Sequence, residues 1–144
     1  MKKALFLGAV ALFAAAGIAR AEGPNPIEIR QTALDLMSAD FAGIRAVVAS
    51  KGDVKTTEAG AKAIQRFAAL MPQLFPAGSD KGKTKAKPEI WSDNAGFVKA
   101  AMALGDAGGK LAVLAKAGDA AGVAAQVKLV GAACGACHKD YRQK

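Results

Sequence analysis

The stretch from residue 123 to residue 138, VAAQVKLVGAACGACH, combines a helical pattern with the reactive residues of this 144-residue chain. Its apolar and sulfur-bearing side chains recur at spacings of four and three residues, which is the period of one face of an α-helix. These side chains belong to Val123, Val127, Val130, Cys134 and Cys137. Both cysteines therefore share a face with the valines, and we expect whatever they bind to lie against the core of a helical bundle.

The end of this stretch, Cys134-Gly135-Ala136-Cys137-His138, holds the two cysteines and the one histidine of the chain. C-x-x-C-H is typical of covalent attachment of a c-type haem, in which two thiols bond to the porphyrin and the adjacent imidazole binds iron. A thioredoxin-like pair would need a βαβ setting, a structural zinc site would need four ligands, and a plain disulfide would leave the histidine unexplained. The motif predicts one covalently attached haem c per chain, with His138 as the axial iron ligand.

The first 21 residues have the parts of a secretory signal peptide. Residues 2 and 3 are lysines, residues 4–18 are apolar, and residues 19–21 are Ala-Arg-Ala, a cleavage sequence. The apolar part is shorter than the roughly 20 residues that span a membrane, so we expect cleavage, the alternative being an uncleaved anchor. No later stretch is expected to span a bilayer. The mature protein, residues 22–144, is expected in the bacterial periplasm, where c-type haem is attached.

The mature length suits one domain. Loss of Lys2, Lys3 and Arg20 lowers the formal net charge from +8 to +5. A charge of this size is weak evidence for nucleic-acid binding, which export also disfavours; docking to an acidic redox partner is the alternative to ordinary solubility. Haem attachment would use both thiols, so we expect neither a disulfide nor a free thiol in this oxidising compartment.

Four segments carry helical periodicity, at about 26–50, 56–74, 92–117 and 119–142. Their apolar stripes contain Leu34, Met37, Phe41, Ile44 and Val48; Ile64, Phe67, Met71 and Leu74; Phe97, Leu104, Leu111 and Leu114; and the valines named above. Thr56 or Thr57, Ser92 and Asp119 are the expected N-caps. The pattern predicts an all-α antiparallel four-helix bundle with up-down-up-down connectivity and a cofactor in its core near the C-terminal helix.

The longer connection, residues 75–91, contains four lysines between glycines: Lys81, Lys83, Lys85 and Lys87. It is either a basic docking patch or a solvated connector, and the connector is the preferred interpretation because charge blocks are commonly exposed loops.

The chain resembles the cytochrome c′ family, whose members are standard examples of up-down-up-down bundles and carry C-x-x-C-H near the end of the last helix. Further matches are Arg30-Gln31 with Leu34, the stretch 87–93 (KPEIWSD), and His138 followed by Tyr141-Arg142. The resemblance covers the whole mature chain.

The resemblance also implies the state of the iron. In low-spin relatives a methionine ligand lies four residues after the position of Arg30, and this position is Leu34 here. Leucine cannot coordinate iron, so the resemblance implies a five-coordinate, high-spin haem with Leu34 over the distal face. Such family members bind nitric oxide and carbon monoxide and can carry single electrons. Because leucine donates no hydrogen bond, bound dioxygen is disfavoured.

Two other function classes remain open. Met37, on the same stripe as Leu34, would as sixth ligand give a low-spin Met–His electron carrier, although a core methionine is commoner. Met71 and Met102 are expected in the core. An enzyme such as a peroxidase or nitric oxide reductase is the least favoured class, because peroxidase chemistry benefits from distal acid–base groups and no distal histidine exists.

The resemblance places further residues around the haem. Arg30 and Gln31 are expected at the propionates, Glu89 at the pocket rim, Trp91 near the haem edge and Arg142 on the proximal side. The alternatives are an exposed first-turn pair, a boundary tryptophan with a satisfied N–H, and an arginine bound to the last helix carbonyls.

The expected partners are a diatomic gas, periplasmic redox proteins and a second copy of the chain. Many family members are dimers through the first two helices. The residues expected to leave apolar surface there are Phe41, Val47, Val48 and Phe67, the alternative being a monomer that buries them.

Overall fold

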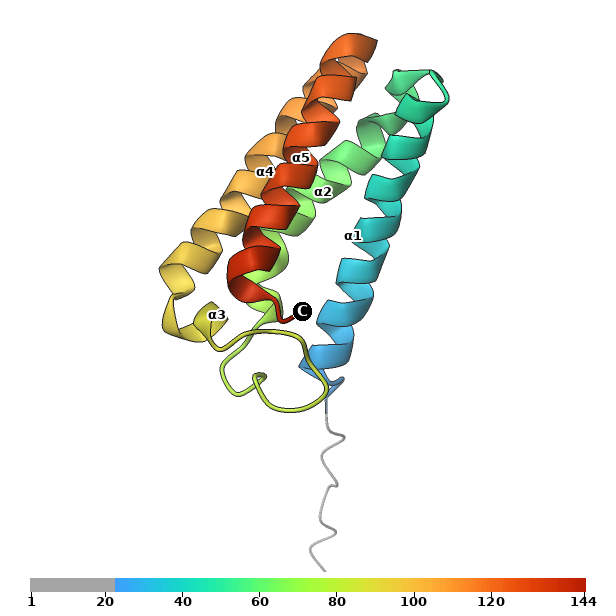
Figure 1. Ribbon diagram of the computed structural model, residues 1–144. Coiled ribbons are helices and arrows are strands. Elements are labelled where there is room, and N and C mark those ends of the chain that lie inside the picture. The colour runs from blue at the N-terminus through green and yellow to red at the C-terminus, as the bar shows by residue number, and fades with distance from the viewer. Residues whose placement is uncertain (1–22) are drawn as a thin grey trace, which may run out of the picture.

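The computed structural model describes residues 23–144, and the predicted signal peptide lies outside them. The elements are α1 (Pro26–Ala49), the 3-10 helix η1 (Val54–Thr57), α2 (Glu58–Leu70), the 3-10 helix η2 (Met71–Leu74), α3 (Glu89–Ser92), α4 (Asn94–Ala117) and α5 (Ala120–Tyr141). The long helices α1, α2, α4 and α5 run up, down, up and down as an antiparallel bundle (Figure 1). The predicted fold class is confirmed.

Local capping explains where the bundle helices begin and end. The side chains of Asn25, Asp93 and Asp119 accept hydrogen bonds from free N–H groups at the starts of α1, α4 and α5, which stabilises those ends. Asp119 was the predicted cap. Gly118 ends α4 in the left-handed conformation, with φ of 73°, and glycine adopts this conformation without the steric cost of a Cβ.

Two predicted caps are wrong. Ser92 is the last residue of the short helix α3, and Asp93 caps α4 instead, because its backbone (φ −118°, ψ 53°) separates the two helices. Thr57 precedes α2, but its hydroxyl donates to the Val54 carbonyl at 2.7 Å and caps nothing. The capping side chain in this region is that of Asp53, which begins η1.

Small residues let α2 and α4 approach closely. Ala61 and Ala68 of α2 and Ala101 and Gly108 of α4 are buried in their interface. A Cβ added to Gly108 would lie 3.1 Å from Ile64 Cγ2, so a larger residue would push the helices apart. This pair forms the packed half of the bundle.

The apolar side chains of α1 are much less buried than their helical spacing predicts. Only Ile27, Arg30 and Ile44 are buried on this helix, whereas Leu34 and Met37 are half-buried. α1 stands apart from α5 over most of its length (Figure 1). The middle of α1 therefore lacks a close helical neighbour on the side of α5.

Met71 and Met102, which were both expected in the core, differ in burial. Met71 is buried, as expected, but Met102 is 64% exposed on α4, so its assignment to the core is wrong.

α5 has the length and composition of a membrane-crossing helix, with a mean hydropathy of 1.4, in contrast to the expectation that no stretch after the signal peptide would have them. Its Val123, Val127 and Val130 are buried in the bundle core. Only 17% of the apolar window of α5 is buried within the protein, so core packing accounts for only part of this apolar composition.

Candidate functional site

The last turns of α5 carry the C-x-x-C-H motif. Cys134 and Cys137 are half-buried and pack against the core of the bundle, which confirms their predicted place on the valine face. Burial raises the pKa of both thiols, and for Cys137 the nearby charges of Cys134 and Asp140 raise it further. Both side chains are therefore protonated thiols at neutral pH rather than reactive thiolates.

His138 follows the second cysteine directly. Although its side chain is largely exposed, partial burial lowers its pKa, and the positive charge of Arg142 lowers it further. A lowered pKa keeps the imidazole neutral at pH 7, and a neutral imidazole is the form that binds a metal. Arg142 therefore lies close enough to His138 for its charge to act on the imidazole.

This donor set fits a haem rather than a bare metal ion. Within residues 23–144, no group of three or more His, Cys, Asp and Glu side chains could hold a metal by itself. Cys134, Cys137 and His138 instead offer two thiols for covalent attachment and one axial nitrogen, while a porphyrin brings its own four nitrogen ligands. The site therefore has the groups that a c-type haem requires.

Leu34 and Met37 differ in their contacts on α1. Met37 is partly buried and packs against the hydrophobic core, whereas Leu34 is half-buried without belonging to the side chains packed on it. Higher on the same helix, Phe41 lies toward α5, 3.9 Å from where a Cβ on Gly131 would be. Leu34 is thus the one side chain of this stripe that is not packed on the hydrophobic core.

Arg30 lies one turn before Leu34 and is only 2% exposed, so an exposed first-turn position is wrong for it. Its Nη1 donates to Ser79 Oγ, and its Nη2 donates to the Ser79 carbonyl and to Thr84 Oγ1, each at 2.8 Å. The guanidinium also lies over the Phe75 ring, 4.9 Å from its centroid. Arginine has five N–H donors, so two remain after these bonds.

The other residues placed by the resemblance lie along the same loop. Gln31 Nε2 donates to the Lys83 carbonyl at 3.0 Å, and Glu89 is exposed at the start of α3. Trp91 Nε1 donates to the carbonyls of Phe75 and Pro76 at 3.1 and 3.2 Å. Trp91 is therefore a boundary residue with a satisfied N–H, the alternative considered for it.

The 75–88 loop connects α1 with the end of α5. On one side it receives the hydrogen bonds of Arg30 and Gln31. On the other, Lys87 N donates to the Tyr141 carbonyl at 3.0 Å, and Gln143 N donates to the Lys85 carbonyl at 2.8 Å. The loop passes below the bundle beside the C-terminus (Figure 1). The loop is thus anchored on both sides, while Lys81, Lys83 and Lys85 are exposed, as expected of a solvated connector.

Tyr141 forms a second link that sequence reasoning missed. Its hydroxyl donates to Asp93 Oδ2 at 2.7 Å, and its ring packs edge-on against Phe97 at 5.4 Å between centroids. The bond to the Asp93 carboxylate raises the pKa of Tyr141 to about 12. This contact ties the last turn of α5 to the first turn of α4, and only the nearness of Tyr141 to the motif hinted at it.

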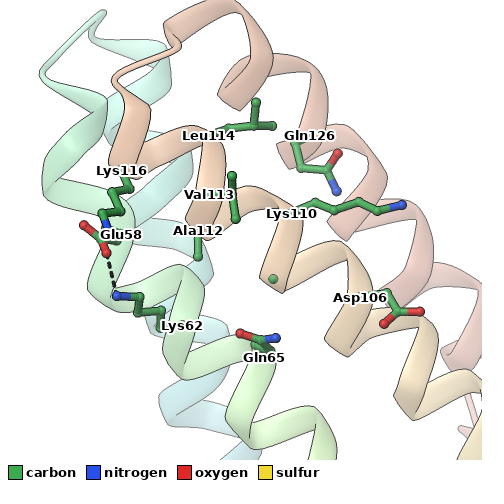
Figure 2. A pocket seen from close by; sticks show the side chains of 11 residues that line it. Glu58, Lys62, Gln65, Asp106, Lys110, Ala112, Val113, Leu114, Lys116 and Gln126 are labelled. Carbon is green, nitrogen blue, oxygen red and sulfur yellow. Dashed lines mark ion pairs between the residues drawn. The ribbon is translucent and has the colours of Figure 1, made fainter.

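A surface hollow of about 960 Å³ lies away from these residues, against α2, α4 and α5 (Figure 2). Charges of both signs line it, including Lys110, Asp106 and the ion pair of Glu58 with Lys62. Its lining contains no residue of the C-x-x-C-H motif or of α1, so the hollow is separate from the candidate site.

The apolar surface of the first two helices differs from that expected. Phe41, Val48 and Phe67 pack partly against the core, and Val47 is half-buried. The exposed large apolar side chains of α1 and α2 are instead Ile29, Leu36 and Leu70, of which Leu36 is 66% exposed.

Comparison with known proteins confirms the family resemblance. A family model described as cytochrome C′ matches residues 25–142. Cytochrome c′ of Rubrivivax gelatinosus is 36% identical over 123 residues, covering 83% of this chain and 95% of the relative.

Solved structures agree in fold. The nitric oxide complex of a leucine-to-isoleucine variant of cytochrome c prime from Alcaligenes xylosoxidans has a TM-score of 0.74 and 36% identity, covering 83% of this chain and 94% of that one. A cytochrome c′ described as having ligand-controlled dimer dissociation has a TM-score of 0.78 and 33% identity, with coverages of 83% and 95%.

Proposed function

The chain belongs to the cytochrome c′ family, and from this premise we propose that it is a periplasmic haem c protein that binds nitric oxide or carbon monoxide and can carry single electrons. One haem per chain is attached through Cys134 and Cys137, and its iron is five-coordinate and high-spin. The proposal rests on two residues of the sequence: one axial donor, His138, and a leucine, Leu34, at the position that the family resemblance assigns to the distal face. The protein is not an enzyme in this proposal.

The bound haem supplies a vacant iron position for a diatomic ligand and a one-electron redox couple. The protein's own part begins with His138, which its neighbours keep neutral and therefore able to bind iron. Arg142 holds a fixed positive charge beside that imidazole. Leu34 offers bulk without a hydrogen-bond donor, which favours apolar diatomic ligands and slows their approach.

The remaining site residues hold the edge of the haem in this proposal. Arg30 keeps two N–H donors beyond its loop bonds, and guanidinium groups bind carboxylates well. Arg30 and Gln31 therefore bind the propionates, and Glu89 lies at the pocket rim.

A low-spin electron carrier with Met37 as sixth ligand is the second candidate. Met37 packs against the protein core, and this supports the first candidate, because a core position is the commoner role of a methionine. The coordination number separates the two.

Export and dimerisation complete the proposal. Residues 1–21 are removed as a signal peptide, as their composition predicts. Two chains pair through α1 and α2, which expose Ile29, Leu36 and Leu70; a solved relative described by its ligand-controlled dimer dissociation supports this pairing.

The test is the absorption spectrum of the purified holoprotein, ferric and dithionite-reduced, with and without nitric oxide. We expect broad high-spin bands that change when the gas is added. Sharp low-spin bands in the reduced protein that resist the gas would reject the five-coordinate haem and favour Met37 as a ligand.

A further inference from the structure

We propose that the positively charged end of the molecule docks an acidic one-electron carrier protein. This surface, the basic end, consists of Lys81, Lys83, Lys85, Lys87, Lys139, Arg142 and Lys144. The inference rests on the proposed function, because it assigns the partner and the docking place for electron exchange with the haem.

Backbone pairing brings the two basic segments of the chain together. Gln143 N donates to the Lys85 carbonyl at 2.8 Å, Ala86 pairs with Arg142, and Lys87 Nζ donates to the Lys139 carbonyl at 2.8 Å. Residues more than fifty positions apart in the sequence therefore form one surface, which the sequence pattern of the loop alone did not show.

The charge of the mature chain is concentrated on this surface. Residues 80–89 and 138–144 contain seven Lys and Arg against three acids, Asp80, Glu89 and Asp140, a net charge of +4. The whole mature chain contains 17 Lys and Arg against 12 acids, a net charge of +5. The rest of the protein is thus almost neutral, and even two haem propionates at this end would leave it positive.

The lysines of the loop are free to meet a partner. Along residues 23–144 the one ion pair joins Lys62 to Glu58, away from the basic end. Lys81, Lys83 and Lys85 are exposed, and the loop bonds that involve Lys83 and Lys85 use their backbone carbonyls. Their charges are therefore not neutralised within the protein.

The basic end also adjoins the haem-attachment motif. Lys139 follows His138 directly, and the charge of Arg142 acts on His138. A partner docked here would lie beside the haem, so that a reduced carrier loses one electron and the ferric iron gains it. Complementary charge accelerates such encounters and selects the partner.

The test compares two triple variants of the holoprotein with equal net charge. One replaces Lys81, Lys83 and Lys85 by Gln, and the matched control makes the same change at three exposed lysines of α4 and α5, namely Lys99, Lys110 and Lys128. Stopped-flow kinetics follow reduction of the ferric haem by flavodoxin hydroquinone, an acidic flavoprotein, and by reduced lumiflavin, a small neutral reductant. Circular dichroism checks that both variants are folded.

At low salt, we expect the loop variant to react with flavodoxin about tenfold more slowly than the wild type, within the range of electrostatic steering. The control should change little, high salt should remove the difference, and lumiflavin should reduce all three proteins equally. Equal slowing in both variants, or in neither, would overturn the proposal. The proposal would also be overturned if the loop variant kept its flavodoxin kinetics but lost binding to phosphatidylglycerol vesicles. That result would indicate that the basic end binds a membrane surface. Failure of lumiflavin to reduce the wild-type haem would instead reject the proposed function itself.

Discussion

Leu34 and Met37 show how neighbouring residues on one helical stripe take different roles. Both are half-buried and apolar, yet only Met37 packs on the core. A side chain that is not packed on the core is available to a ligand, and leucine offers that ligand bulk but no hydrogen-bond donor. The gas kinetics of the protein should therefore depend on the size of residue 34.

Replacement of Leu34 by Ala should speed binding of carbon monoxide to the reduced protein. Relief of a steric contact worth about 1.4 kcal/mol, within the range for overpacked sites, corresponds to about a tenfold faster association. Flash photolysis would measure the rate. Leu129→Ala, on the exposed side of α5, is the control, and an unchanged rate in the Leu34 variant would remove its distal role.

At the scale of elements, the 75–88 loop takes the place of direct packing between α1 and α5. Arg30 binds it from α1, while Tyr141 and Gln143 bind it from the C-terminal end. Because the two helices share few contacts of their own, these polar links should contribute strongly to the geometry of the site.

Replacement of Arg30 by Met should lower the free energy of unfolding by about 2 kcal/mol, because the change removes three hydrogen bonds from a charged group and leaves Ser79 and Thr84 without that donor. Urea unfolding measures the loss. Gln31→Ala removes one exposed hydrogen bond to the same loop and should cost much less. Similar losses in both variants would contradict a special role for Arg30.

The link between Tyr141 and Asp93 should appear in the alkaline titration of the chain's one tyrosine. The pKa of Tyr141 is raised from an ordinary 10.0 to about 12, so the folded state holds the phenol proton more tightly than the unfolded state. The stabilisation is therefore complete below about pH 10 and is lost as pH rises through about 12.

Phenolate absorbance of the wild type should titrate near pH 12. Asp93→Asn should lower that midpoint while keeping an N-cap for α4, because asparagine caps helices as well as aspartate does. The melting temperature of Tyr141→Phe should lie below that of the wild type at neutral pH and approach it near pH 12. A wild-type midpoint near pH 10 would show that the bond is absent in solution.

At the scale of the whole molecule, two surfaces of the bundle differ in charge and polarity. Positive charge gathers at the loop end, while α1 and α2 expose Ile29, Leu36 and Leu70. The first surface suits a charged partner, and the second suits an apolar contact with a second copy.

Replacement of Leu36 by Lys should convert the proposed dimer to a monomer, because a charge would then be buried in an apolar contact. Sedimentation velocity of the holoprotein measures the change. Val113→Lys places the same charge on α4, at a side chain that is 70% exposed, and should leave the dimer intact. If the Leu36 variant were still a dimer, the interface would not include Leu36.

The sequence by itself determined the four-helix bundle and the haem-attachment chemistry, because both depend on local spacing. Apolar residues three and four apart select the face of one helix, and the C-x-x-C-H residues lie within two of its turns. The expectation of Met102 in the core was wrong. Met102 lies outside the apolar stripe of its helix, and an apolar residue type alone does not say whether a neighbour covers it.

Only the tertiary structure decided the burial of Arg30, the bond of Tyr141 to Asp93 and the joining of the basic segments. Arg30 and Ser79 are 49 residues apart, and Tyr141 and Asp93 are 48 apart. Such contacts have no period in the sequence. They form because the bundle brings the start of α1, the 75–88 loop and the end of α5 to one end of the molecule, where polar groups must find partners.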